Sequence, residues 1–201
     1  MMKKKLSLGC GEFLKKGYVN VDNSLTCKPD VRHDLNIIPY PFNDHECELI
    51  EADHVLEHLD NPFSVMKELY RISNNGAEIR IRVPHFSRGF THAEHKSGFD
   101  ITFPYYFSPS FPGGYQGVSL RLKSMKLRWF AQKYFKRKVM SKILYLAGSV
   151  LGVIFDLCAN LSPSFCSRIW CFWVGGFEEI EFQFIVEKDP CALTSCMTKE
   201  R

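Results

Sequence analysis

The first half of the chain predicts short strands separated by loops and by one helix. Apolar runs of strand length cover residues 5–8, 18–21, 31–34 and 47–52, and each ends at a glycine or an aspartate. Residues 61–72 space their apolar side chains as a helix does, and Asn61 followed by Pro62 suits a helix start. Residues 77–83 then alternate apolar and polar positions, as in a strand, until Pro84 closes the run.

The second half predicts two more strands. Residues 118–129 alternate with a phase slip at Ser124, and residues 179–187 alternate strongly, so we expect an antiparallel pair with residues 130–177 inserted between them. Together the elements predict an α/β, Rossmann-like fold with a mostly parallel, twisted sheet and an antiparallel last strand. The ligand crevice of such a sheet lies beyond the C-terminal ends of its strands.

The composition fits a single domain. A chain of 201 residues with 45% hydrophobic residues can bury one core, so we expect one domain over residues 1–190 and a disordered tail over residues 191–201. The eight cysteines form no C-x-x-C pair, and Gly9 and Gly11 interrupt the N-terminal apolar run before it reaches the length of a signal peptide. We therefore expect a reducing, cytoplasmic location.

A Gly-x-Gly turn follows the first predicted strand. Gly9 and Gly11 would let the backbone pass close to a ligand, although a tight turn in an α/β core needs the same residues. A dinucleotide-binding turn would have a third glycine and a ribose-binding acid about 20 residues later. Here Leu14 occupies the third-glycine position and Asp22 comes much sooner. A ligand without a pyrophosphate fits better, which disfavours a nicotinamide-dependent oxidoreductase.

Three aspartates end three successive predicted strands beside this turn. Asp22 is placed to accept two vicinal ribose hydroxyls, and Asp34 to accept an adenine amino group, while Asp53 follows the fourth strand. Each aspartate alone is as typical of a turn or a helix cap as it is of a ligand-binding site. The ordered series is much harder to explain by turns, and it indicates a nucleoside-containing ligand.

These segments resemble the class I S-adenosylmethionine-dependent methyltransferases, specifically the methyltransferase type 11 group. LSLGCGEFLKKGYVNVD is similar to the first motif with its ribose acid, and DLNIIPYPFND to the adenine-side motif. ADHVLEHLDNPFSVMKELYRIS and NNGAEIRIRVP resemble the segments around the fourth and fifth strands. The likeness is good over residues 5 to about 100, and EIEFQFIVEK fits the last strand.

The resemblance implies a methyltransferase that uses S-adenosylmethionine and releases S-adenosylhomocysteine. It places the first-strand turn against the methionine part of the cofactor, Asp22 on the ribose, the next motif at the adenine, and the fourth-strand end near the sulfonium. The cofactor-binding residues implied are Leu8, Gly9, Cys10, Gly11, Asp22, Asp34, Leu35, Asp53 and His54. The connection before Asp22 is shorter than the usual helix, so we expect a modest cofactor affinity.

Histidines supply the candidates for a catalytic base. His85, directly after the fifth strand, is the first choice for deprotonating an acceptor hydroxyl, and His95 is the second. A loop histidine bonded to its neighbours is the alternative for His85. His92, Glu94 and His95 together suit a metal ion, but nothing in the sequence shows that they converge, and we expect no metal. Glu57 and His58 are interpreted as helix-end and packing residues.

The predicted insertion is apolar and flanked by basic residues. No acid lies between Asp100 and Asp156, whereas residues 117–142 are rich in Lys and Arg. Residues 143–155 carry no charge, and a stretch of about 13 residues is too short to span a bilayer. The segment through residues 130–160 is therefore either a lid over the acceptor site or a contact with a membrane surface.

The preferred function is O-methylation of a small-molecule, glycan or lipid-linked acceptor by a cytoplasmic enzyme that is peripheral to the membrane if the insertion binds lipid. The alternative is a non-catalytic, membrane-peripheral binding protein that keeps the methyltransferase fold. Nucleic acid is not an expected partner, although the basic segment would suit it.

Overall fold

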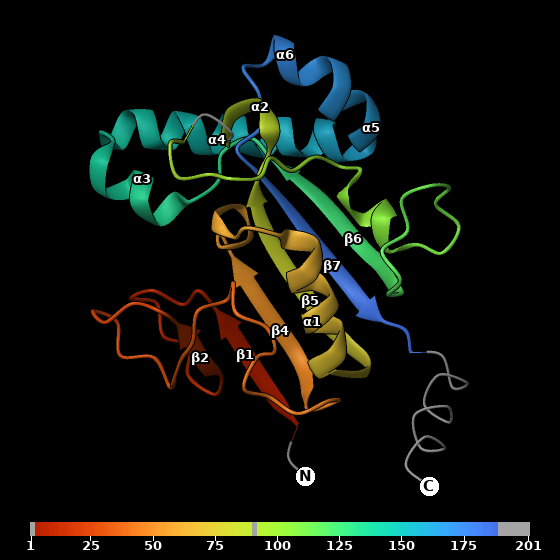
Figure 1. The fold of residues 1–201 in the computed structure, drawn as a ribbon. Helices are drawn as coiled ribbons and strands as arrows, with labels where there is room; N and C mark the ends of the chain where they lie inside the picture. Colours follow the sequence, from red (N-terminus) through yellow and green to blue (C-terminus); the bar gives the residue numbers. More distant parts are fainter. Residues whose placement is uncertain (1–2, 90–91, 189–201) are drawn as a thin grey trace, which may run out of the picture.

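The computed structural model describes residues 3–89 and 92–188, which build one seven-stranded sheet (Figure 1). Its strands are β1 (Lys4–Leu8), β2 (Val19–Asp22), β3 (Val31–Arg32), β4 (Cys47–Asp53), β5 (Ser73–Pro84), β6 (Leu120–Arg128) and β7 (Glu179–Val186). Their spatial order is β3-β2-β1-β4-β5-β7-β6. The first five strands are parallel, and β7 runs antiparallel between β5 and β6. The predicted fold class is confirmed, including its antiparallel last strand.

The connections of the first half match the predicted turns and helix. Residues 9–18 join β1 to the parallel strand β2 without a helix. The short η1 (Leu56–His58) follows β4, and α1 (Pro62–Ile72) comes next, where the Asn61 side chain accepts a hydrogen bond from the Ser64 backbone N–H at 3.1 Å. Asn61 thus caps α1, as the sequence predicts. The register of β6 against β7 shifts between Leu122 and Ser124, at the predicted phase slip.

Two strand boundaries differ from the sequence prediction. Strand β3 stops at Arg32, so Asp34 lies in the loop beyond it, where its Oδ1 accepts a hydrogen bond from the Asn36 backbone N–H at 2.9 Å. This local turn replaces further pairing with β2. The strand predicted from residue 77 begins earlier, because β5 starts at Ser73 directly after α1 and includes Gly76 with a positive φ.

The α1 side of the sheet holds the apolar core. Ile79, Ile81, Phe182 and Phe184 are fully buried, and the fully buried Phe107, from η2 (Phe103–Phe107), packs against Phe184. The alternation of β5 and β7 directs these side chains to a single face. Burying several large apolar groups in one layer is the main source of stability that this half of the molecule has.

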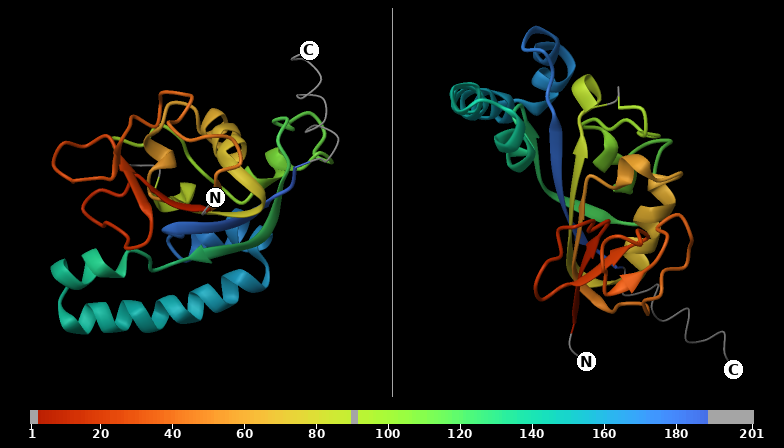
Figure 2. Two further views of the ribbon diagram at one scale, coloured as in Figure 1. Left: turned by 90° about the horizontal axis from the view of Figure 1, so that it is seen from below. Right: turned by 90° about the vertical axis from the view of Figure 1, so that its left-hand side faces the viewer.

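The opposite face of the sheet carries charged side chains at the alternate positions. Glu51 of β4 pairs with Lys15 at 2.7 Å and with Arg80 of β5 at 3.1 Å. Arg80 also pairs with Glu78 at 2.8 Å, and Glu78 with Lys123 at 3.0 Å. Over the middle of this face no helix lies on the sheet among the described residues (Figure 2). The sheet is therefore open to solvent where a helical layer would otherwise cover it.

The residues between β6 and β7 form a helical layer on the charged side of the sheet. This layer contains α3 (Lys133–Val139), α4 (Lys142–Leu161), α5 (Pro163–Phe165), η3 (Cys166–Trp170) and α6 (Cys171–Trp173). Both views in Figure 2 place α3 and α4 across the sheet from α1. The short helix α2 (Phe86–Gly89) follows β5. The expected disordered tail, residues 191–201, lies outside the described residues.

Side-chain hydrogen bonds attach α4 to β6. The Asn160 side chain accepts from the Leu127 backbone N–H at 2.9 Å and donates to the Leu127 carbonyl at 3.0 Å. Asp156 Oδ1 accepts from the Trp129 backbone N–H at 2.7 Å. The helix has 20 residues, so the expectation that this apolar segment is too short to span a bilayer is wrong on length. The sequence estimate counted only the uncharged run, whereas Lys142 and Asp156 are also helical.

Candidate functional site

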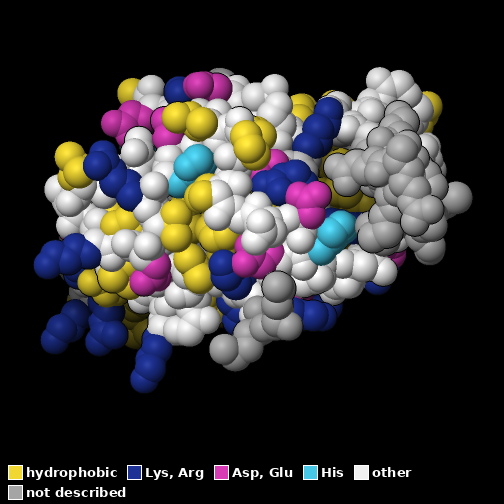
Figure 3. Space-filling model, turned by 60° about the horizontal axis from the view of Figure 1, so that its bottom comes forward, with side chains coloured by type: hydrophobic (Ala, Val, Ile, Leu, Met, Phe, Trp, Pro, Cys, Tyr) yellow, Lys and Arg dark blue, Asp and Glu magenta, His cyan; other side chains and the backbone are white. Residues whose placement is uncertain are grey.

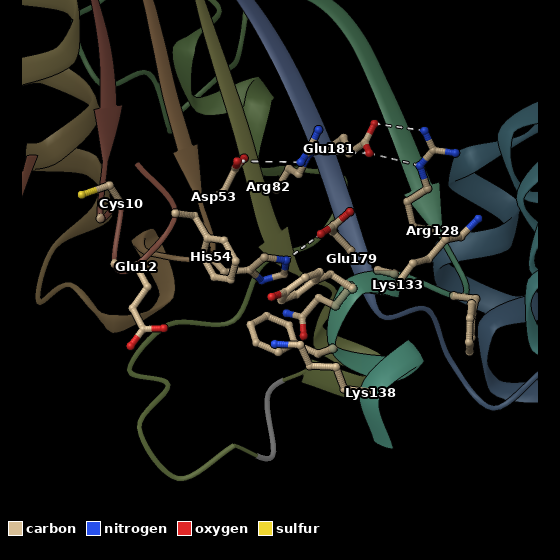
Figure 4. A pocket seen from close by; sticks show the side chains of 18 of the residues that line it. Cys10, Glu12, Asp53, His54, Arg82, Arg128, Lys133, Lys138, Glu179 and Glu181 are labelled. Atoms are coloured by element: carbon tan, nitrogen blue, oxygen red, sulfur yellow. Dashed lines mark hydrogen bonds and ion pairs between the residues drawn. The ribbon is translucent and has the colours of Figure 1, made fainter. Parts of the chain in front are cut away.

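A cavity of about 1120 Å³ opens beyond the C-terminal ends of the central strands. Its walls come from three parts of the chain: the turn after β1, the ends of β4 and β5 with the start of β7, and the insertion through α3 (Figure 4). Five of the predicted cofactor residues line it: Gly9, Cys10, Gly11, Asp53 and His54. This is the position at which parallel α/β sheets bind ligands.

Gly9 cannot carry a side chain in this turn. Its φ is +60°, a region that residues other than glycine rarely adopt, and a Cβ would lie 2.5 Å from Cγ2 of Val55. The Cys10 backbone N–H donates to the Val21 carbonyl at 3.3 Å. The turn is thereby held against both β2 and the segment after β4, so its backbone is fixed at the cavity wall.

The carboxylate of Asp22 holds the same turn from the end of β2. Its Oδ2 accepts a hydrogen bond from the Gly11 backbone N–H at 2.8 Å, and its Oδ1 accepts one from the Ser24 backbone N–H at 2.8 Å. Each carboxylate oxygen keeps further acceptor capacity, so both can still bind hydroxyl donors. Asp22 itself does not line the cavity but stands directly behind its Gly11 wall.

Three predicted cofactor residues lie away from the cavity. Leu8 and Leu35 are buried in the core, and Asp34 forms the local turn with Asn36. The Leu35 carbonyl accepts a hydrogen bond from the Tyr40 hydroxyl at 2.9 Å. The structure thus brings together the turn, Asp22 as the predicted ribose acid, and the end of β4, while the predicted adenine residues stay on the far side of β2.

His54 is the most strongly perturbed group that lines the cavity. Its φ of +53° is unusual for a residue with a side chain, and its Nε2 lies 2.6 Å from Oε2 of Glu179. Burial alone would lower the pKa of His54, but the hydrogen bond with Glu179 and the nearby carboxylate of Glu57 outweigh it and raise that pKa to about 9. His54 is therefore a cation at neutral pH and is unsuited to act as a base.

Charged residues that the sequence analysis did not single out line the rest of the cavity. Arg128 of β6 pairs with Glu181 of β7 at 3.2 Å, and Arg82 of β5 lies 3.7 Å from both Glu181 and Asp53 (Figure 4). Each sits at an alternate position of its strand, so the strict alternation of residues 77–83 and 179–187 was the available signal. A sheet buried on both faces would have shown near-continuous apolar runs instead.

His85 does not lie where a general base would be useful. Its side chain is 0% exposed and does not line the cavity. Its Nδ1 lies 2.7 Å from the Ser87 hydroxyl and its Nε2 lies 2.8 Å from the Ser167 hydroxyl. Burial lowers the pKa of His85 to about 4, so it stays neutral and weakly basic. The position contradicts the expected role and matches the alternative, a histidine bonded to its neighbours.

His95 lies in a cluster of imidazoles outside the cavity. Its ring stacks on His92 with centroids 4.7 Å apart and meets the His58 ring edge-on at 4.9 Å. The sequence analysis grouped His92, Glu94 and His95, whereas the structure brings His95 together with His58 and the carboxylate of Glu57. Glu57 and His58 end η1 and Glu57 is buried, in agreement with their interpretation as helix-end and packing residues.

Comparison with known proteins adds to this picture at the level of the fold. No protein family model and no curated protein matches the chain. Solved structures do match it. A methyltransferase dependent on S-adenosylmethionine from Archaeoglobus fulgidus has a TM-score of 0.53 and 16% identity, over 91% of this chain and 86% of the other.

Two further solved structures with this fold have different named activities. Coclaurine N-methyltransferase bound to N-methylheliamine and S-adenosylhomocysteine matches with a TM-score of 0.54 and 10% identity, over 90% of this chain and 66% of the other. The [4+2]-cyclase SpnF matches with a TM-score of 0.52 and 11% identity, over 94% and 77%. The chain therefore has the fold of the class I S-adenosylmethionine-dependent methyltransferases, which confirms the resemblance at that level. Membership of the type 11 group stays a prediction.

Proposed function

We propose that this protein is an S-adenosylmethionine-dependent methyltransferase. The observation that carries the proposal is the pairing of Asp22 with the Gly11 backbone N–H, which joins a ribose acceptor to the cavity wall. A nucleoside sulfonium fits this arrangement because its sugar needs vicinal hydroxyl acceptors and it has no pyrophosphate to neutralise. SpnF shows that the fold alone does not fix the reaction, so the proposal rests on these residues.

The protein's contribution to methyl transfer is mainly alignment. Gly9 and Gly11 allow the cofactor's methionine part to lie against bare backbone, and Asp22 fixes its ribose. Asp53 and Glu179 place carboxylates on the cavity wall, where Asp53 is paired with Lys15 and Glu179 with His54. When bound, S-adenosylmethionine supplies an activated methyl group, and the chain has to orient the acceptor and exclude water.

We propose an oxygen acceptor on a small molecule, glycan or lipid-linked compound. The cavity wall formed by α3 combines the aromatic rings of Tyr134 and Phe135 with the ammonium of Lys138. Such a wall suits an acceptor with both apolar and anionic parts. An acceptor attached to a lipid would also explain why this wall continues into the exposed apolar helices.

The outer surface of the insertion supports a peripheral position on an anionic membrane. Ile143 is 81% exposed, Leu161 87% and Trp173 74%, and α4 is the described helix that is long and apolar enough to cross a membrane by length and composition. Lys and Arg side chains gather at the lower left of Figure 3, the end that α3 occupies in Figure 2. The bonds from Asp156 and Asn160 to β6 favour a helix lying in the interface over one that spans it.

Cofactor binding is tested first by calorimetry with S-adenosylmethionine. We expect saturable binding to the wild type and a loss of affinity of at least about tenfold in Asp22→Asn, because that carboxylate holds both the turn and the ribose. Asp44→Asn, which removes an exposed acid at the other end of the sheet, should bind as the wild type does. No binding to the wild type would overturn the proposal. Binding without transfer to any hydroxyl acceptor would favour the non-catalytic alternative.

Membrane contact is tested separately by sedimentation with vesicles of neutral lipid, with and without anionic lipid. We expect binding that requires anionic lipid and that is weakened by Arg137→Gln with Lys138→Gln, whereas Lys67→Gln on α1, across the sheet, changes nothing. Equal sedimentation of all variants, or none with any vesicle, would remove the membrane proposal and leave the helices as a lid.

A further inference from the structure

The cluster around Glu57 contains a buried carboxylate with no hydrogen-bond partner. Glu57 is 1% exposed, and neither Oε1 nor Oε2 accepts a hydrogen bond within the described part of the chain. The nearest cation among the described residues is His54, whose Nδ1 lies 3.4 Å from Oε1 without forming a hydrogen bond. An ionised carboxylate in such a place is costly unless a cation or a strong donor faces it.

Two imidazoles face the same space as this carboxylate. One ring nitrogen each from His58 and His95 and one oxygen of Glu57 lie within 4.8 Å of one another. Glu57 and His58 belong to η1 after β4, and His95 comes from the loop after α2. Residues of different chain segments thus converge with the ligand types that a divalent cation takes from proteins.

The hydrogen bonding of His58 prepares it for this role. Its Nδ1 lies 3.2 Å from the Glu94 carbonyl oxygen, which can only accept, so Nδ1 carries the proton. The Nε2 atom is then the unprotonated nitrogen. Metal-bound histidines typically donate their second ring N–H to a carbonyl or carboxylate in this way, which fixes the ring orientation and the tautomer.

Backbone hydrogen bonds hold the two segments together. The Lys96 backbone N–H donates to the Glu57 carbonyl at 2.7 Å, and the Ser97 backbone N–H donates to the same carbonyl at 3.3 Å. Lys96 also pairs with Asp60 at 2.5 Å. The loop that carries His95 is therefore anchored directly on the segment that carries Glu57 and His58, independently of any ion.

We propose that Glu57, His58 and His95 form a binding site for a divalent first-row transition-metal ion. Two imidazoles and one carboxylate suit manganese, iron, cobalt or zinc, and three protein ligands leave coordination positions open for water or another oxygen. The sequence analysis expected no metal because the sequence could not show that residues 37 positions apart converge, so the proposal departs from that expectation. Thiols take no part, because this ligand set contains no cysteine.

The proposed site lies beside the cavity but does not open into it. His54 lines the cavity and contacts Glu57, so the ion would lie one side chain from the cavity, and none of its three ligands lines that cavity. The ion would neutralise the buried Glu57 carboxylate and hold η1 and the loop after α2 together.

The experiment is a titration of the full chain with Mn²⁺. Binding is measured in electron paramagnetic resonance as the loss of the signal of the free ion. Mn²⁺ is chosen because it prefers oxygen and imidazole to thiolates, of which the chain has eight potential sources. We expect one site per chain in the wild type and affinity weakened by at least about tenfold in Glu57→Gln and in His95→Ala. His33→Ala, a histidine bonded to the Ile37 carbonyl elsewhere, is the matched control and should not change the affinity.

The outcomes separate this site from the proposed function. His95→Ala does not touch the cavity and should bind S-adenosylmethionine as the wild type does, which also shows that the variant is folded. No saturable Mn²⁺ binding, or equal binding in all variants, overturns the metal site and leaves the methyltransferase proposal standing. A second measurement is the absorption spectrum of the chain with bound Co²⁺. A thiolate-to-cobalt charge-transfer band would show that cysteines bind the ion in place of imidazole and carboxylate, and would also overturn the metal site. Mn²⁺ binding without S-adenosylmethionine binding would overturn the function and keep the site.

Discussion

The two faces of the sheet are built from the same strands but are stabilised differently. On the α1 side, Ile81 and Phe182 pair across β5 and β7 and are fully buried. On the other side, Arg82 and Glu181 occupy the neighbouring positions of the same two strands and are charged. The α1 face therefore stabilises the fold by apolar packing, whereas the opposite face supplies the charged side chains at the cavity and is accessible to solvent.

The largest effect should follow from removing an aromatic side chain on the apolar face. Phe182→Ala leaves a cavity between Phe103 and Phe184 and should lower the free energy of unfolding by about 3–5 kcal/mol. Urea denaturation followed by circular dichroism measures it. A loss below about 1 kcal/mol would mean that this face is loosely packed and that the contrast between the faces is false.

A smaller effect concerns His85, which is buried and neutral. Its pKa in the folded chain is about 4, below the usual value of 6.5, so the unfolded chain binds more protons between those values. Stability is therefore full above pH 6.5 and falls as the pH drops toward 4, by up to about 3 kcal/mol. His85→Gln, measured by urea denaturation at pH 7 and pH 5, should flatten this dependence. An unchanged slope would contradict the buried-neutral state.

On the charged side, the attachment of α4 should matter less than the core. Asp156→Ala removes the acceptor for the Trp129 backbone N–H and the partner of Arg128, at 2.7 and 3.2 Å. We expect a loss of about 1–3 kcal/mol. Hydrogen exchange should localise the change to α4 and β6. Faster exchange spread evenly over the sheet would show instead that the helix stabilises the whole domain.

The smallest effect should come from the open part of the charged face. Arg80→Met keeps the aliphatic stem but removes the pairs with Glu51 and Glu78, and we expect a change of less than about 1 kcal/mol because exposed ion pairs contribute little. Thermal unfolding at low and high salt measures it. A destabilisation as large as that of Phe182→Ala would show that a partner or an unseen layer covers this face.

The sequence predicted the fold well because the strands and helices depend on local sequence patterns. Strand positions, the Asn61 cap and the slip at Ser124 each depend on a few neighbouring residues. The end of β3 was missed because the turn at Asp34 competes with pairing to β2. A turn and a two-residue strand extension have similar energies, so the sequence pattern does not show which one forms.

The candidate site was predictable only where it follows strand ends. Gly9, Gly11, Asp53 and His54 line the cavity because parallel strands bring their C-terminal ends to one edge. His85 also follows a strand, but Ser167 of the insertion covers it, which no local pattern encodes. The approach of His95 to Glu57 depends likewise on the backbone bond from Lys96, a contact between distant segments.

The amide of Asn160 has a consequence for how the chain avoids aggregation. Strand β6 is the edge of the sheet, and an edge strand offers its free N–H and C=O groups to any other strand it meets. Asn160 accepts from and donates to the two backbone groups of Leu127, as the next strand would. A single side chain thereby closes the edge at that point, so another copy of the chain cannot extend the sheet through Leu127.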